Sequence, residues 1–129
     1  MTIIVPNVGE VAIAARILDQ ALVLKLYSND IIPTEEMSLP SFTEVTGGGY
    51  VAVDLAYENW VISSLGIALY PAHNFQFTGP TTGPGTIFGY YVVNPTGVVL
   101  WAERFPTSAV PFVPILGSLI RITPRIQVA

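Results

Sequence analysis

The chain of 129 residues contains no cysteine and a single histidine, His73. Without cysteine it cannot form a disulfide scaffold, a thiolate-ligated zinc or iron–sulfur site, or a thiol nucleophile. A site that needs two imidazoles from one subunit is also excluded. These absences disfavour catalysis before any motif is considered, and the length suits one compact domain.

Charged side chains are scarce as well. They make up 11% of the chain, against about 25% in typical soluble domains, while hydrophobic residues account for 51%. A surface with so little charge is expected to be covered in part by a partner or by other copies of the chain. The alternative is a small apolar β protein whose surface consists of Thr, Ser, Asn and backbone, and we favour assembly. The net charge of −4 disfavours binding to nucleic acid.

The scarcity of charge is greatest between Glu58 and Glu103, where the chain has no Asp, Glu, Lys or Arg. Prolines and glycines interrupt this stretch before about 20 apolar residues accumulate, so it does not predict a membrane span. The apolar start of the chain lacks a basic region and is broken by Pro6 and Glu10, which is unlike a signal peptide. We therefore expect the protein to begin in a cytoplasm, with no membrane partner.

Residues 1–20 are predicted to form an N-terminal arm and one short helix. Asn7 stands three residues before Glu10, which resembles a capping box. Over residues 8–20, apolar side chains recur at helical spacing, at Val8, Val11, Ala12, Ala15 and Leu18. Because this helix lies outside the β pattern that follows, we expect residues 1–20 to dock onto a partner or a neighbouring subunit. Their removal is expected to leave the rest of the chain folded.

Residues 21–129 are predicted to form one all-β domain, a jelly-roll-like β-sandwich of about eight short strands. Alternating apolar residues and turn signals predict strands over 21–28, 42–46, 50–55, 60–64, 74–78, 87–93, 98–105 and 118–128. The sequence Asn94-Pro95-Thr96-Gly97 predicts a type I turn that closes a hairpin. Glycines 47–49 predict a bend or a close neighbour, and Pro124 predicts an edge or a bulge.

No catalytic, cofactor-binding or metal-ligating residue is predicted. The chain has no G-x-S-x-G elbow, and His73 is interpreted as a loop residue bonded to backbone. A pair such as Glu44 and Glu103 could serve a glycosidase across a cleft, but nothing in the sequence favours it. The glycine-rich segments 47–49 and 79–86 lack the Gly-Lys-Ser/Thr of a phosphate loop, and no acidic residues alternate as in a calcium loop. The chain is therefore expected not to be an enzyme and to need no cofactor.

Aromatic residues are dense for a chain of this size. Alternation predicts that about half of them belong to the core, and an exposed subset could bind sugar or form a subunit interface. We favour an interface, because the shortage of charge extends well beyond a single groove.

The strand around Glu103 raises a specific question about burial. Trp101, Glu103 and Phe105 share one face of a strand. A carboxylate between two large aromatic residues on a buried face requires a counter-charge, and Arg121 and Arg125 are the candidates within the chain, beside an arginine of a neighbouring subunit. The other interpretation places this face in an interface with Glu103 at its rim. We favour the buried ion pair and assign Glu103 no catalytic role.

Several short motifs are spread over nearly the whole chain. They are Ile4-Val5-Pro6-Asn7-Val8-Gly9-Glu10, Leu24-Lys25-Leu26-Tyr27-Ser28-Asn29-Asp30, Phe42-Thr43-Glu44, Gly49-Tyr50, the strand at Trp60 and Leu100-Trp101-Ala102-Glu103-Arg104-Phe105. These motifs resemble those of small virion structural proteins encoded by tailed bacteriophages. The resemblance implies a β-sandwich protein of the virion, of the kind that decorates capsids as a trimeric cement protein, and it supplies no catalytic residues.

The expected function is therefore capsid decoration, with the protein assembled in the host cytoplasm and bound to the major capsid protein or another virion protein. A homotrimer is expected from the charge-free span 59–102 and the apolar loop 112–116. A tail-fibre or receptor-binding module that recognises host surface glycans is the alternative. A carbohydrate-binding module of a secreted enzyme comes third, because no signal peptide is predicted.

Overall fold

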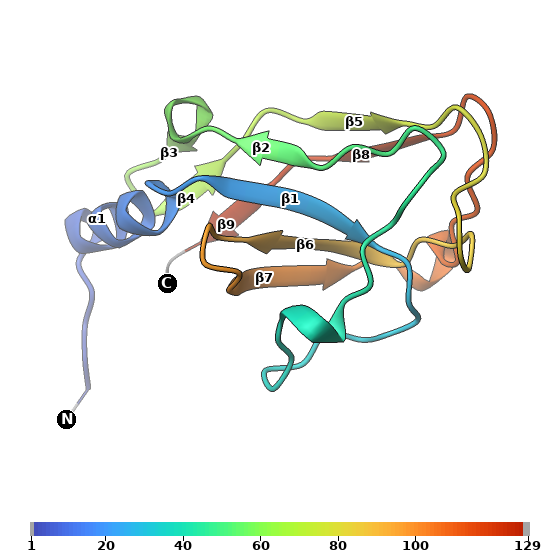
Figure 1. Cartoon of the computed structure of the whole chain (residues 1–129). Helices are drawn as coiled ribbons and strands as arrows, with labels where there is room; N and C mark the ends of the chain where they lie inside the picture. Colours follow the sequence, from blue (N-terminus) through green and yellow to red (C-terminus); the bar gives the residue numbers. More distant parts are fainter. Residues whose placement is uncertain (1, 128–129) are drawn as a thin grey trace.

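The computed structural model describes residues 2–127, in which one helix precedes a series of short antiparallel strands (Figure 1). The chain is thus mostly β with a single α-helix, in agreement with the predicted class. The elements are α1 (Asn7–Leu18), β1 (Leu22–Tyr27), β2 (Val53–Leu55), β3 (Val61–Ile62), β4 (Ile67–Leu69), β5 (His73–Gln76), β6 (Gly89–Val93), β7 (Val99–Arg104), β8 (Leu119–Ile122) and β9 (Arg125–Gln127). Short 3₁₀ turns lie at Leu39–Ser41, Tyr57–Asn59 and Thr107–Ala109.

The largest sheet has the strand order β2-β1-β6-β7. Its two inner strands are β1 and β6, and β6 is buried at every position because side chains pack against both of its faces. The hairpin predicted at 94–97 is confirmed: the Gly97 N–H donates to the Asn94 carbonyl at 3.0 Å, and β6 pairs with β7. Two smaller sheets have the orders β3-β4-β9 and β5-β8.

Two strand predictions are wrong in detail, and one strand was missed. Residues 42–46 form no named strand: they make an isolated bridge between Glu44 and Tyr27, and the Val45 N–H donates to the Leu26 carbonyl. Next to this bridge, the Asn29 side chain accepts from the Thr43 N–H and donates to the Ser41 carbonyl. The strand β4 was not predicted, since the sequence around it lacks clear alternation. The predicted strand 118–128 is divided at Pro124, so that β8 pairs with β5 while β9 pairs with β4.

Two hydrophobic clusters fill the molecule. The main cluster joins side chains of the largest sheet, such as Leu24 and Val92, to Phe75 of β5 and Ile120 of β8. The second cluster lies on the other face of the largest sheet, beneath the segment that leads from β1 to Phe42, and centres on Tyr27 and Tyr91. The Tyr27 ring is fully buried, and its centroid lies 5.4 Å from that of Phe42.

The helix α1 is anchored at its C-terminal end. Ala14 and Leu18 are buried, Leu18 belongs to the main cluster, and the helix contacts β3 and β4. Val8, at the other end, is 81% exposed. The predicted capping box is wrong, because Pro6 is the N-cap residue, Asn7 is already helical and no side chain caps the helix. Removal of residues 1–20 would take Leu18 out of the core, and the proposed independence of residues 21–129 stays a prediction.

Glycines 47–49 provide both a bend and room for a neighbour, as predicted. All three have positive φ, of 77°, 63° and 80°. A Cβ on Gly48 would lie 2.7 Å from the Gly79 carbonyl oxygen, so the loop 79–86 can approach only a glycine there. The two segments are joined by the bond from the Thr82 N–H to the Thr46 carbonyl at 2.8 Å.

Candidate functional site

Residues that could carry acid–base or metal chemistry are dispersed over the fold. His73 begins β5, is half-buried and packs its ring edge-on against Phe75 at 4.7 Å between centroids. Within residues 2–127, no group of three His, Asp or Glu side chains could hold a metal ion. The described part of the chain therefore offers no constellation of these residue types for metal catalysis.

The carboxylates of Glu44 and Glu103 face different tyrosines. Glu44 accepts a hydrogen bond from the Tyr50 hydroxyl at 2.8 Å and lies 3.6 Å from the Lys25 ammonium. Burial, and next in size the Glu103 carboxylate, raise the pKa of Tyr90 above its usual value. Glu44 thus lies near Tyr50 and Tyr91, whereas Glu103 lies near Tyr90 and Tyr27. No observation brings the two carboxylates together, and the glycosidase pair that the sequence left open gains no support.

The predicted buried ion pair of Glu103 is wrong. Glu103 shares the main-cluster side of β7 with Trp101 and Phe105, as alternation requires, but its side chain is exposed. Arg121 and Arg125 are exposed too, and among residues 2–127 the ion pairs are Lys25–Glu44 and Arg104–Asp30. The physical reason is that β7 is the edge strand of its sheet, so a side chain on its inner face still reaches solvent.

Most aromatic side chains belong to the core, more than the half that alternation predicts. Buried rings are those of Tyr27, Phe42, Trp60, Phe75, Phe77, Phe88, Tyr90 and Tyr91. Tyr57 is exposed, whereas Trp101 and Tyr70 are half-buried and both belong to a cluster with Trp60. Few aromatic side chains are therefore exposed enough to stack against a sugar ring, and the exposed apolar surface is mainly aliphatic.

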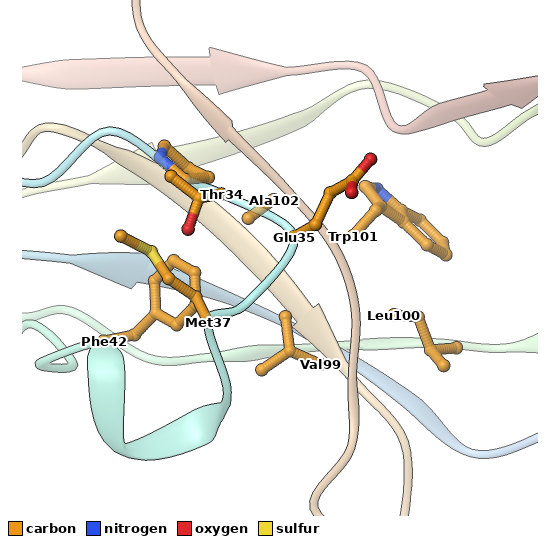
Figure 2. Close-up of a pocket in the computed structure, with 9 residues that line it drawn as sticks. Thr34, Glu35, Met37, Phe42, Val99, Leu100, Trp101 and Ala102 are labelled. Carbon is orange, nitrogen blue, oxygen red and sulfur yellow. The ribbon is translucent and has the colours of Figure 1, made fainter.

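Two grooves flank the open edge of β7. We call the first the loop-side groove: it encloses about 400 Å³ between β7 and the segment after β1, and is lined by Pro33, Thr34, Glu35, Met37, Phe42, Val99, Leu100, Trp101 and Ala102. Figure 2 shows Met37 and Phe42 toward one end of this groove and Glu35 and Trp101 toward the other. The second, the helix-side groove, encloses about 460 Å³ and is lined by Ile17, Leu100, Trp101, Arg125, Ile126 and Gln127.

A β-bulge explains why both grooves share Leu100 and Trp101. The register of β6 with β7 shifts between Val92 and Val93, so that Val99 and Trp101 pair with successive residues of β6 and Leu100 is inserted between them. Leu100 and Trp101 consequently both pack against the main cluster, whereas Val99 and Ala102 pack against the second. The indole of Trp101 contacts that of Trp60 edge-on, at 6.3 Å between centroids.

Exposed aliphatic side chains gather at two further places. In the N-terminal arm, which we define as residues 2–6, Ile3 and Ile4 are 84% and 82% exposed. At the opposite end of the molecule (Figure 1), the loop before β8 exposes Val113, Ile115 and Leu116. These surfaces, together with the grooves, can bind another polypeptide by apolar contact. The sequence pointed to the apolar loop and to Trp101, but not to the grooves, because alternation does not reveal which strand lies at an edge.

The chain matches no protein-family model, no curated protein sequence and no solved structure. Among residues 2–127, no helix has the length and apolar character needed to cross a membrane.

Proposed function

We propose that the protein is a structural component of a tailed-phage virion, and that it decorates and stabilises the head as a homotrimeric cement protein without enzymatic activity. The observation that carries this proposal is the exposed aliphatic surface of a charge-poor chain. Ile3, Ile4 and Leu116 are each more than three-quarters exposed in the single chain, while charged residues make up only 11% of the sequence. Apolar surface of this kind gains free energy when a partner covers it.

The two ends of the molecule suit a protein that binds both its own copies and a shell. The apolar arm and Val8 lie at one end, and the apolar loop 112–116 lies at the other (Figure 1). Burying one exposed Ile or Leu side chain is worth about 1.5–3 kcal/mol. A few such side chains at each end would therefore provide the gross binding energy that assembly needs against its entropic cost.

We further propose that the sheets form the two layers of a jelly-roll-like β-sandwich. In support, the main cluster lies between the largest sheet and β5 and β8, with Leu24 and Leu26 on one side and Phe75 and Ile122 on the other. Figure 1 shows β5 and β8 running alongside the largest sheet. This arrangement resembles two facing layers, and β9 continues the chain from β8 into the third small sheet.

The alternative is a tail-fibre or receptor-binding module for host glycans. The loop-side groove supports it, because Glu35 supplies a carboxylate beside the indole of Trp101 and Thr34 lines the same groove. Sugars are commonly bound by hydrogen-bonding side chains next to an aromatic ring. The scarcity of exposed aromatic side chains makes this the weaker proposal.

Immunogold electron microscopy of phage particles whose genome encodes the chain tests the proposal. Antibody against the purified protein is expected to label the heads, and pre-immune serum is the control. Gold confined to tail fibres would replace decoration by the receptor-binding alternative. Purified particles without label, and without the chain in their denatured protein content, would overturn the virion role altogether.

Light scattering of the purified protein tests the trimer separately. The mass is expected to correspond to three chains in the micromolar range. A stable monomer throughout that range would refute trimerisation in solution. The exposed aliphatic side chains would then not be covered by other copies of the chain.

A further inference from the structure

The edge strand β7 has backbone groups that are open to pairing. Within residues 2–127, the backbone of β7 is hydrogen-bonded to that of β6 alone, while the Arg104 side chain donates to the Asp30 carboxylate and the Ile31 carbonyl. The Phe105 N–H donates to the Phe88 carbonyl, and hydrogen-bonded positions alternate along an antiparallel pair, so Glu103 and Trp101 face β6. Ala102 and Arg104 therefore direct their N–H and C=O groups away from the sheet, where a further strand could bind them.

The two grooves lie where the side chains of such a strand would go. The loop-side groove runs along the β7 edge and extends over the face of the second cluster, with Phe42 and Met37. The helix-side groove extends over the face of the main cluster, with Ile126, and the two grooves meet at Leu100 and Trp101. Successive side chains of a β-strand point to opposite faces of the sheet. An added strand would thus fill the two grooves alternately, which is the usual form of β-strand addition.

The N-terminal arm has the length and composition of the missing strand. It reads Thr2-Ile3-Ile4-Val5-Pro6, and β-branched residues of this kind favour strands. Five extended residues span about 17 Å, which is close to the span of the six residues of β7. Pro6 has no N–H to donate, so a strand formed by the arm would end there.

The helix α1 holds the arm away from its own sheet. Leu18 is fully buried at one end of α1, and the twelve residues of the helix place the root of the arm about 18 Å from it. Figure 1 shows the arm leaving the helix on the side away from the largest sheet. A neighbouring copy is therefore better placed than the same chain to receive it.

We propose that residues 2–6 of one copy add as a strand to the β7 edge of a neighbouring copy, with Ile4 in one groove and Ile3 and Val5 in the other. This arm exchange rests on the self-association included in the proposed function. It does not depend on where in a virion, or whether in a virion, the copies meet. A head-to-tail contact of this kind closes into a ring when the rotation between copies allows it, and a trimer is one such ring.

Disulfide trapping tests the exchange directly, because the chain has no cysteine of its own. Two full-length variants, Ile4→Cys with an added mass tag and Ala102→Cys without one, are mixed and oxidised mildly. Opposed residues of paired strands bring their Cβ atoms within reach of a disulfide. We expect the tagged and untagged chains to cross-link. Ile3→Cys and Val5→Cys, whose side chains would lie on the opposite face of the added strand, are expected to cross-link to Ala102→Cys much less.

The matched control is Val61→Cys, since Val61 is 70% exposed and lies in β3, outside both grooves. It is expected to cross-link to Ala102→Cys no more than random collision allows. Circular dichroism of each variant checks that it is folded. An Ile4→Cys chain that cross-links no better than Val61→Cys would overturn the proposal. So would a chain that carries both Ile4→Cys and Ala102→Cys and closes its disulfide within itself, because the arm would then cover its own β7.

The contribution of the arm to assembly is measured with Ile4→Asp. This variant is expected to weaken self-association by roughly tenfold or more, as judged by sedimentation velocity over a range of concentrations. Val61→Asp, a similarly exposed position, is expected to leave the association unchanged. Equal weakening by both variants would contradict a specific role for the arm. Arm exchange observed together with unlabelled phage particles would overturn the virion role but not the exchange, so the two failures are distinguishable.

Discussion

Replacement of Gly89 by alanine is a sharp test of how the largest sheet is packed. Gly89 lies at the start of β6, directly opposite Tyr27 of β1 and Arg104 of β7. A Cβ on Gly89 would fall on the carbonyl oxygen of Glu103 and lie 2.5 Å from the Tyr27 hydroxyl. The φ of Gly89 is not positive, so the expected effect comes from crowding alone and not from backbone conformation.

The magnitude follows from how little the neighbours can move. Tyr27 is fully buried and is held by Phe42 and Tyr91, at 5.4 and 6.4 Å between ring centroids. Overpacking a well-packed core costs about 1–3 kcal/mol. Because one obstacle is backbone and the other is a ring without free space, we expect Gly89→Ala to lower the free energy of unfolding by about 3 kcal/mol, the upper end of that range.

Urea unfolding followed by fluorescence of the two tryptophans measures this difference. Gly79→Ala is the matched control, because a Cβ there would have no atom within 4 Å and the φ is ordinary. The control is expected to change the free energy of unfolding by less than about 0.5 kcal/mol. In a Tyr27→Val background, Gly89→Ala should cost less, with a coupling of at least about 0.5 kcal/mol. Equal stability of Gly89→Ala and Gly79→Ala would refute the packing argument.

Three further predictions concern pH, charge and the helix. Burial raises the pKa of Tyr27 and of Tyr91 to about 12, so their contribution to stability is complete below about pH 10 and is lost as the pH rises through 12. Urea unfolding at increasing alkaline pH, with absorbance titration of tyrosinate, checks this, and simple ionisation of every tyrosine near pH 10 would contradict it. Glu103→Gln should leave the melting temperature unchanged because the side chain is exposed. A decrease of more than about 1 kcal/mol in the free energy of unfolding would instead support the buried ion pair that the sequence predicted. Leu18→Ala should lower the free energy of unfolding, measured with urea, by about 2–5 kcal/mol. Val8→Ala, at an 81% exposed position, should lower it by less than about 0.5 kcal/mol. Similar decreases for both variants would mean that α1 is not anchored in the core.

Much of the local structure could be predicted because its causes are close together in the sequence. The alternation in residues 21–28 depends on neighbouring side chains, and β1 appears there with Leu22, Leu24 and Leu26 buried. The turn at Asn94-Pro95-Thr96-Gly97 likewise needs only local residues, since the Asn94 side chain accepts from the N–H groups of Thr96 and Val98. The single helix was also predictable from spacing, although its cap was not.

The candidate site was less predictable, because it depends on which strands become neighbours. Periodicity places Trp101, Glu103 and Phe105 on one face, but it carries no information about whether their strand is central or at an edge. Tertiary structure puts β7 at the edge, which exposes Glu103 and opens a groove on each face. The structural role of Pro124 was not predictable for the same reason. It lies between β8, which pairs with β5, and β9, which pairs with β4 in another sheet.

The sequence by itself determined that the chain is a charge-poor, mostly β protein with one N-terminal helix. Composition, hydrophobic period and turn residues act locally and are independent of the final topology. Only the tertiary structure decided that Leu18 anchors the helix, that Gly89 makes room for Tyr27 and that β7 has no outer partner in the described chain. Each of these depends on contacts between distant segments, and the free energy of such contacts is set by which surfaces meet when the chain folds.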